Sequence, residues 1–219
     1  FFAARTVICF AIWFLLARSL YRASIRQNVG HTEWLTRRFR RVSAPGILLF
    51  ALTLTCAAFD WLMSLDFVWY STIFGVYVFS GSLLAALSFI ALIAIFLRRN
   101  SVLQDEITVE HYHDLGKLMF AFVVFWTYIA FSQYFLIWYA NIPEETAWFL
   151  HRWDHNWKYM SVLIIFGHFV FPFFVLISRE PKRHVPTMTF MGIWLMFIHW
   201  VDIYWIITPN FSHHVHFSW

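Results

Sequence analysis

Long runs of hydrophobic residues dominate the chain, and short polar segments separate them. A helix needs about 20 apolar residues to cross the hydrocarbon core of a bilayer. Six runs approach or exceed that length, and none shows the strict apolar–polar alternation of a barrel strand, so each is predicted to be a transmembrane helix. The six predicted spans are approximately Phe1–Leu20, Ala44–Leu65, Ser71–Leu97, Gly116–Ala140, Trp157–Ser178 and Thr187–Thr208.

Helix-breaking residues fall close to the predicted span ends. Proline has no backbone N–H to donate, so it is expected at helix termini rather than in helix interiors. These positions are Pro45-Gly46 at the start of the second span, Pro143 after the fourth, Pro181 and Pro186 around the loop before the sixth, and Pro209 at its end. The pattern therefore predicts an all-α, polytopic helical bundle that forms a single transmembrane domain over residues 1–219.

Composition excludes a water-soluble globule. Hydrophobic residues make up 61% of the chain and charged residues only 13%, whereas soluble domains carry about 25% charged residues. Cys9 and Cys56 both lie in apolar runs. Two cysteines are too few for an iron–sulfur cluster, and they lack the CxxCH spacing of covalently attached haem. A redox metal centre of either kind is therefore expected on another chain.

The positive charges indicate an orientation. Thirteen of the sixteen Lys and Arg residues fall on one side when the loops alternate between two faces, and only Arg5, Arg152 and Lys158 fall on the other. The positive-inside rule assigns the first side to the cytoplasm. The loop Asn141–Asn156 and the His-rich tail are then outside. Aromatic residues expected at that outer interface are Trp69, Tyr70, Trp138, Tyr139, Trp148, Trp153 and Trp157.

The basic segment Arg22–Arg41 has two interpretations. It is either a cytoplasmic loop that fixes the orientation or a patch that binds nucleic acid or anionic lipid. The first interpretation is favoured, because the net charge of +4 comes from loop residues whose distribution already follows topology. Lipid is expected to surround the protein, and no nucleic-acid partner is expected.

A few ionisable residues lie within the predicted spans, where an Asp near a helix centre costs about 2.5–3.5 kcal/mol on insertion. Asp60 lies past the middle of the second span, towards the predicted outer face, and Asp66 follows near its end. His168 lies near the middle of the fifth span. A single histidine there is either a group satisfied by an interhelical hydrogen bond or a functional group.

The sixth span carries a His–Asp pair. His199 and Asp202 are three residues apart, so they share a helix face. A carboxylate beside an imidazole favours a proton relay, because imidazole titrates near neutral pH. The short hairpin Arg179–Pro186 makes the fifth and sixth spans antiparallel neighbours and brings His168 to a comparable height.

Polar residues also mark the fourth span and the segment before it. His111, His113, Asp114 and Lys117 precede or begin this span. An HxH pair is a weak metal signal without a third ligand, so no metal is expected, and a helix start with Asp114 complementing the dipole is favoured. His113, Asp114 and Lys117 remain candidates for proton uptake from the cytoplasm. Further polar residues continue along this span, and they serve either a proton path or helix packing: Tyr128, Ser132, Gln133 and Tyr134.

Three segments carry a resemblance to a known family. The stretch His111–Phe149, HYHDLGKLMFAFVVFWTYIAFSQYFLIWYANIPEETAWF, resembles the ActF-type membrane subunit of bacterial alternative complex III, a quinol:cytochrome c (or high-potential iron–sulfur protein) oxidoreductase. Phe59–Tyr77, FDWLMSLDFVWYSTIFGVY, and the ending PNFSHHVHFSW are similar to the same subunit. The resemblance implies membership of the NrfD-like (polysulfide reductase membrane-subunit) superfamily. Its members have about ten helices, so the six spans here would lack helices at both ends.

The resemblance also implies a location and partners. It places the chain in the bacterial inner membrane as a multi-pass subunit. Its partners would be a multihaem cytochrome, an iron–sulfur protein, a sister NrfD-like subunit and a terminal oxidase. Haem c and iron–sulfur clusters would lie on those partners. The family places quinol oxidation against the sister subunit, so the chain is expected to be structural and proton-conducting. Whether the chain itself binds menaquinol or another quinol stays open.

Other functions stay open as alternatives. A b-type haem carrier would use one axial histidine from each of two helices, and His168 with His199 is the one candidate pair. A quinol-binding electron-transfer anchor is a related alternative. A transporter is disfavoured because no matched pair of Gly/Pro-broken helices is evident. No catalytic residue is assigned: the chain is either non-catalytic or a quinone-site subunit of an oxidoreductase.

Overall fold

The computed structural model describes residues 1–29 and 33–211, and this part of the chain contains helices and no strand. The structure is 86% helical. Six of its described helices are long and apolar enough to cross a membrane, which confirms the predicted all-α, polytopic bundle. The six spans are Phe2–Gln27, Thr36–Leu65, Phe74–Arg99, Val109–Ala140, Trp157–Ile177 and Val185–Asn210. The predicted outer His-rich tail lies outside the described residues.

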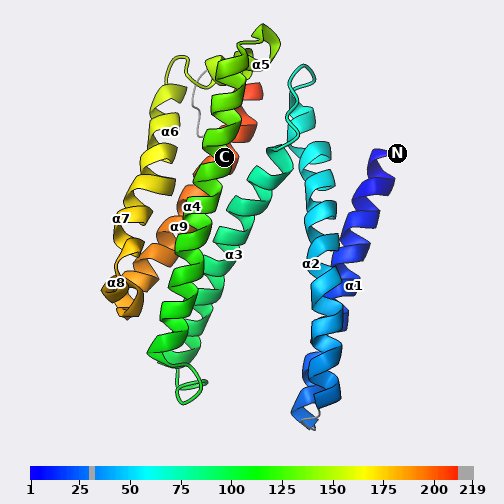
Figure 1. Ribbon diagram of the computed structural model, residues 1–219, viewed down its shortest axis with the longest axis vertical. Helices are drawn as coiled ribbons and strands as arrows, with labels where there is room; N and C mark the ends of the chain where they lie inside the picture. The colour runs from blue at the N-terminus through cyan, green and yellow to red at the C-terminus, as the bar shows by residue number, and fades with distance from the viewer. Residues whose placement is uncertain (30–32, 212–219) are drawn as a thin grey trace. The chain divides into compact units, whose positions relative to one another are not determined.

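Short helical turns join and extend the long helices (Figure 1). In chain order the elements are α1 (Phe2–Val29), α2 (Glu33–Trp61), η1 (Met63–Leu65), α3 (Phe74–Arg99), α4 (Val109–Ala140), α5 (Pro143–His151), α6 (Trp157–Ile164), the π-helical turn η2 (Ile165–Val170), α7 (Phe171–Ile177), α8 (Arg179–Arg183), α9 (Val185–Ile207) and η3 (Thr208–Asn210).

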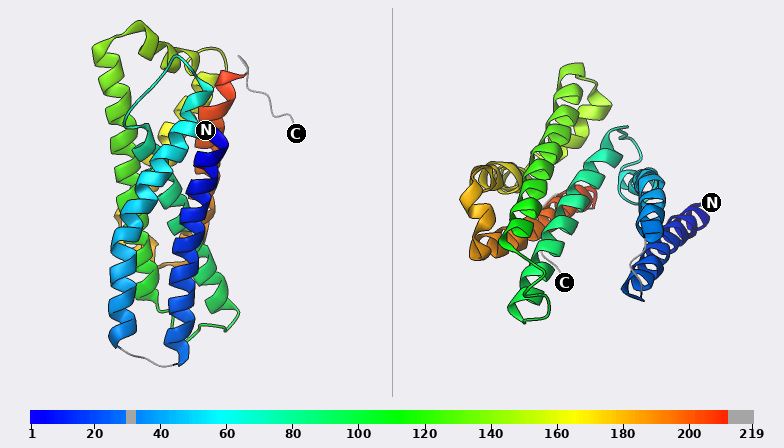
Figure 2. Two further views of the ribbon diagram at one scale, coloured as in Figure 1. Left: turned by 90° about the vertical axis from the view of Figure 1, so that its right-hand side faces the viewer. Right: turned by 60° about the horizontal axis from the view of Figure 1, so that its bottom comes forward.

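The chain forms two compact units, Phe1–Ser64 and Leu65–Trp219. In the first unit α1 and α2 run side by side in both views of Figure 2. The Trp13 indole Nε1 donates to the Thr53 hydroxyl at 2.9 Å. Near the opposite end of the hairpin from the loop between α1 and α2, the Arg5 guanidinium donates to both carboxylate oxygens of Asp60, at 2.5 and 2.9 Å. This bidentate pair accounts for one of the predicted intramembrane carboxylates.

The expectation that Pro45 opens the second span is wrong. Helix α2 begins at Glu33 and continues through Pro45 and Gly46 to Trp61. Proline is tolerated inside transmembrane helices because other groups compensate for the missing backbone hydrogen bond. Most of the segment Arg22–Arg41, predicted to be a loop, is therefore helical in α1 and α2.

The second unit is a bundle of α3, α4, α6–α7 and α9 (Figure 1). Helix α9 packs against α3 and α6, and α4 packs against α3 and α7. Figure 1 shows α5 at one end of this bundle and α8 at the other. We call these two ends the α5 end and the α8 end. The orientation predicted from the sequence places the α5 end outside and the α8 end in the cytoplasm.

The predicted boundaries of the other spans also need correction. Helix α4 begins at Val109 rather than Gly116, because the His111 Nδ1 accepts the backbone N–H of Thr108 at 3.0 Å and so caps an earlier helix start. The predicted loop Asn141–Asn156 contains α5, which has Pro143 in its first turn. Likewise, the loop before the sixth span contains α8, and Pro181 lies within it.

Candidate functional site

Four polar side chains meet inside the second unit. They are Tyr77 from α3, His168 from η2, and His199 and Asp202 from α9. The side chain of His168 is 0% exposed and that of Asp202 is 1% exposed. We call this group the buried cluster. Ionisable groups at this depth in a membrane protein are costly and usually have a specific role.

Asp202 is the centre of the buried cluster. The Tyr77 hydroxyl donates a short hydrogen bond to Asp202 Oδ1. The second carboxylate oxygen, Oδ2, lies 3.9 Å from His199 Nδ1. That distance is too long for a direct hydrogen bond, so a proton passing between the two groups needs a bridging water or a small rotation.

His168 joins the cluster from the neighbouring helix. Its ring lies 6.3 Å from the ring of His199, centroid to centroid, and stacks on Trp126 of α4 at 3.7 Å. His168 therefore lies beside the His–Asp pair, but the expectation that it is the nearest polar group is wrong, because the Tyr77 hydroxyl contacts Asp202 directly. Within the described part of the chain, the two ring nitrogens of His168 and the Nδ1 of His199 have no hydrogen-bond partner.

Local backbone features create room for these rings. A Cβ atom on Gly81 of α3 would lie 2.8 Å from His199 Cε1, so only glycine at this position admits the imidazole. The π-helical turn η2 holds His168, and such turns occur often at functional sites. The Trp194 indole of α9 donates to the carbonyl of Gly167 in that turn at 2.8 Å, which fixes η2 against α9.

An aromatic cavity of about 860 Å³ lies on the α5 side of the buried cluster. Tyr77 and Trp126 line it and also contact the cluster, so they connect the two. Gln133 lies on the cavity wall with 5% of its surface exposed. Other polar lining residues are Thr127, Thr146, Arg152 and Ser161. The cavity is within the size range of small-molecule sites.

The other side of the cluster is mostly apolar. Seven fully buried residues fill the bundle interior between the cluster and the α8 end: Leu84, Met119, Val123, Leu176, Met188, Met191 and Leu195. We call them the apolar layer. The fully buried Ser80 and Ser88 of α3 also lie on this side, and their hydroxyls donate to the carbonyls of Tyr77 and Leu84 in their own helix. The buried Tyr112 and Lys182 lie nearer the α8 end. The ionisable side chains of the cluster are therefore separated from those of the α8 end by mostly apolar packing.

Arg152 lies beside the cavity and is 1% exposed. Its guanidinium donates to the backbone carbonyls of Trp148 at 2.9 Å, Ile206 at 2.7 Å and Trp205 at 3.3 Å. It also lies 3.5 Å from the ring centroid of Trp148. Burial lowers the pKa of Arg152 to about 9, so the group is still charged at neutral pH. It thus caps the carbonyl ends of α5 and α9.

The remaining candidate residues make other contacts. Asp60 belongs to the other unit and pairs with Arg5. Asp66 accepts the backbone N–H groups of Val68 and Trp69 at 3.1 and 3.3 Å, as in a local turn. The Tyr128 side chain is 63% exposed and points away from the bundle interior, unlike Gln133.

The candidates at the start of α4 make local ion pairs. Lys117 Nζ lies 2.7 Å from Asp114 Oδ1, one helical turn apart. His113 Nδ1 lies 3.9 Å from Glu110, which in turn pairs with Arg183 at 2.8 Å. Burial, and then the positive charge of Lys117, lowers the pKa of nearby Lys182. This geometry favours a structural role at the helix start, and the proton-uptake role stays a prediction.

Three side chains of the buried cluster are of types that can bind a metal ion. One ligand atom from each of His168, His199 and Asp202 lies within 4.8 Å of the others. A tetrahedral zinc site requires ligand atoms about 3.4 Å apart, closer than the 3.9 Å between His199 and Asp202. In this conformation His199 Nδ1 and Asp202 Oδ2 are therefore spaced more widely than neighbouring ligands of a tetrahedral zinc ion.

Sequence reasoning did not include Tyr77 or Arg152 among the site residues. The partner of Tyr77 is 125 residues away in the sequence, so no local spacing connects the two. Arg152 was one of only three basic residues on the predicted outer side, and a lone cation between tryptophans was the available signal.

No model of a known protein family matches the chain, and no curated protein is significantly similar to it.

Proposed function

We propose that this chain is an integral membrane subunit of a respiratory quinol:cytochrome c (or high-potential iron–sulfur protein) oxidoreductase of the alternative complex III type, in the bacterial inner membrane. Its role is structural and proton-conducting. The proposed partners are a multihaem cytochrome, an iron–sulfur protein, a sister NrfD-like subunit and a terminal oxidase. The observation that carries the proton-conducting role is the buried cluster within helices able to cross a membrane.

The proposed path uses the two oxygens of Asp202 in turn. A proton arrives at Oδ2 from the His199 side, through the 3.9 Å gap. The carboxyl group then turns about its Cβ–Cγ bond, so that its protonated oxygen takes the place of Oδ1 beside Tyr77. The Tyr77 hydroxyl releases its own proton into the cavity and takes the proton of Asp202 in exchange. Both groups finish with the protons they had at the start, so one proton has moved. Such a chain of exchanging groups is the usual means of crossing a low-dielectric interior.

A second candidate function is a quinol site in the aromatic cavity. Its volume of about 860 Å³, its aromatic walls and the buried Gln133 suit a flat head group with a hydrophobic tail. In this case Tyr77 and Asp202 would accept a proton from the bound quinol. The following experiment separates the two candidates.

We expect Asp202→Asn to reduce proton translocation without abolishing electron transfer. The complex is purified from native membranes with its partner subunits and reconstituted in vesicles, and protons moved per electron are measured beside quinol turnover. Tyr77→Phe, which removes only the hydroxyl, should give the same result. Asp66→Asn is the matched control, because an amide oxygen can still accept the two backbone N–H groups that Asp66 accepts.

Three outcomes have distinct meanings. A fall of the proton yield by half or more with retained turnover supports the relay. Loss of quinol oxidation in an assembled complex would favour the quinol site instead. Unchanged proton yield and turnover in both Asp202→Asn and Tyr77→Phe would refute the relay.

A further inference from the structure

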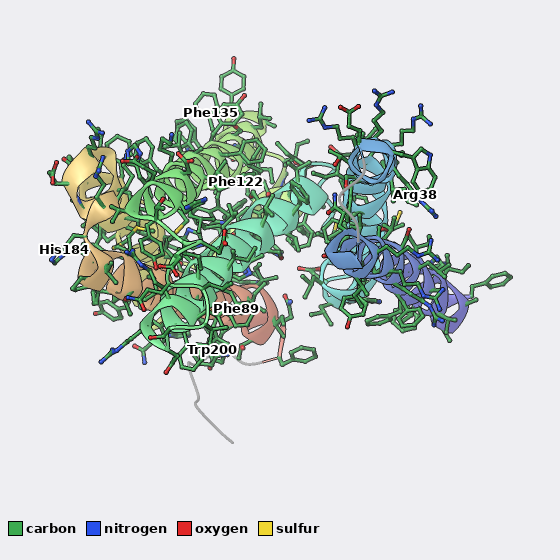
Figure 3. All side chains as sticks on the ribbon, turned by 90° about the horizontal axis from the view of Figure 1, so that it is seen from below. Arg38, Phe89, Phe122, Phe135, His184 and Trp200 are labelled. Carbon is green, nitrogen blue, oxygen red and sulfur yellow. The ribbon has the colours of Figure 1, made fainter. Side chains whose placement is uncertain are left out.

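A basic groove lies between α1 and α2 in the first unit. It has a volume of about 270 Å³ and is lined by four arginines: Arg18, Arg22, Arg26 and Arg38. Leu15, Ser19 and Ala23 complete its lining. Figure 3 looks onto the hairpin from below, with Arg38 labelled on α2. The groove is thus formed by both helices of one unit.

In the part of the chain that the structure describes, the arginines of this groove have no carboxylate partner. Arg18, Arg22 and Arg26 follow one another at intervals of four residues on α1, so like charges lie on one face and repel each other. Arg5 and Arg37 of the same hairpin pair with Asp60 and Glu33. Within the described residues, none of the four groove arginines has a carboxylate within ion-pair distance.

The depth of the groove matches a membrane interface. An α-helix rises 1.5 Å per residue, so Arg22 and Arg26 lie about 26 and 32 Å along α1 from Arg5. The hydrocarbon core of a bilayer is about 30 Å thick. With the Arg5–Asp60 pair near one interface, Arg22 and Arg26 lie at the level of the opposite head groups. Leu15 is 62% exposed and lies about two turns deeper than Arg22, where acyl chains begin.

We infer that the groove binds the phosphate head group of an anionic phospholipid, such as phosphatidylglycerol. Guanidinium groups bind phosphate oxygens through paired N–H donors, and two helices present them from both sides of the groove. The acyl chains lie along the exposed apolar side chains of α1, including Phe14 and Leu15. This site does not depend on the proposed proton-conducting function.

The bound lipid also explains how the like charges are tolerated. One phosphate neutralises part of the repulsion along α1, and it links α1 to α2 through Arg38. Basic pockets on the cytoplasmic side of membrane proteins bind anionic head groups in this way. The sequence-based orientation places this end of the hairpin in the cytoplasm, where anionic lipid is available.

The test measures lipid retained by the full chain in detergent, using native mass spectrometry. The probes are dioleoylphosphatidylglycerol, dioleoylphosphatidylcholine and inorganic phosphate. The groove variant combines Arg22→Gln, Arg26→Gln and Arg38→Gln. The control variant combines Arg40→Gln, Arg41→Gln and Arg99→Gln, which remove three positive charges from exposed positions that do not line the groove.

Each arginine that contacts the head group should raise the affinity for anionic lipid about fivefold. We therefore expect the native chain to prefer phosphatidylglycerol over phosphatidylcholine at least tenfold. The groove variant should lose this preference and the control variant should retain it. Ala23→Phe, which fills the groove without changing charge, should lose it as well and guards against a folding defect in the triple variant. Circular dichroism confirms helical content in each variant.

Three results would overturn the proposal. Equal loss of preference in the groove and control variants would mean general electrostatic attraction. Retained preference in both the groove variant and Ala23→Phe would place the lipid elsewhere. Binding of inorganic phosphate without preference for phosphatidylglycerol would mean that the groove takes a free anion and not a lipid.

Discussion

Arg152 holds two helix ends together at the scale of a single side chain. Its guanidinium donates to the Trp148 carbonyl in α5 and to the Trp205 and Ile206 carbonyls in α9. The two carbonyls of α9 belong to residues 53 and 54 positions away in the sequence. A buried carbonyl that loses its donor costs about 1–3 kcal/mol. The ring of Trp148 adds a cation–π contact at 3.5 Å, which contributes about 1–2 kcal/mol when water is excluded.

We expect Arg152→Met to destabilise the protein by about 2–4 kcal/mol, because it leaves at least two carbonyls without donors. The measurement is thermal unfolding of the purified chain in detergent, followed by circular dichroism. Arg179→Met is the control, since Arg179 is exposed and should change stability by less than about 0.5 kcal/mol. Equal unfolding temperatures for the two variants would contradict the capping role.

The candidate site was predictable at some residues and not at others. His199 and Asp202 share a helix face, and this follows from their spacing of three residues. The position of His168 followed from the short hairpin between two antiparallel spans. The place of Tyr77 depends instead on the register of α3 against α9, which no periodicity within either helix determines. The roles of all four in proton transfer stay predictions.

At the scale of elements, the apolar runs predicted the helices but not where they begin. Runs of about 20 apolar residues locate the hydrocarbon-crossing part of a helix. Polar first turns extend beyond it: α2 begins at Glu33 and α4 at Val109. The rule that proline marks a boundary failed at Pro45, where the helix continues. The cost of proline depends on neighbouring groups, which the local sequence does not specify.

Glycines set the distance between α3 and α9. A Cβ atom on Gly192 would lie 2.9 Å from Leu92 Cγ and 3.3 Å from the backbone oxygen of Ser88. This oxygen belongs to the backbone of α3, so it cannot move away from the added Cβ atom as the end of a side chain could. The close approach of these two helices brings Tyr77 and Asp202 into contact. The site therefore depends on glycine packing some distance from it.

We expect Gly192→Ala to destabilise the bundle by about 1–3 kcal/mol, because the added methyl group overfills a packed interface. The unfolding temperature should fall by about 2–4 °C for each kcal/mol. Gly46→Ala is the matched control: its Cβ would meet only the end of the Leu16 side chain at 3.3 Å, and alanine favours a helix by about 1 kcal/mol. An unfolding temperature for Gly192→Ala at or above that of the native chain would contradict the packing argument.

At the scale of the second unit, the bundle is asymmetric along its length. The aromatic cavity lies on the α5 side of the buried cluster, and the apolar layer lies on the α8 side. In the proposed relay, a proton in the cluster would exchange more readily with the α5 side than with the α8 side, because hydrocarbon-like packing excludes water. In the described part of the chain, the aromatic cavity reaches the cluster from the α5 side. Net transport across the membrane would require the apolar layer to rearrange.

The last prediction concerns access to this asymmetric interior by a charged, membrane-impermeant thiol reagent. In a background with Cys9 and Cys56 replaced, Gln133→Cys on the cavity wall should react when the reagent is added on the α5 side. Met119→Cys in the apolar layer should react from neither side, because the residue is fully buried. The exposed positions Glu144→Cys and Asp105→Cys report which aqueous side faces the α5 and α8 ends. Reaction of Met119→Cys from the α8 side would contradict the prediction that the reagent enters from the α5 side alone. Failure of Gln133→Cys to react in a folded chain would contradict it as well.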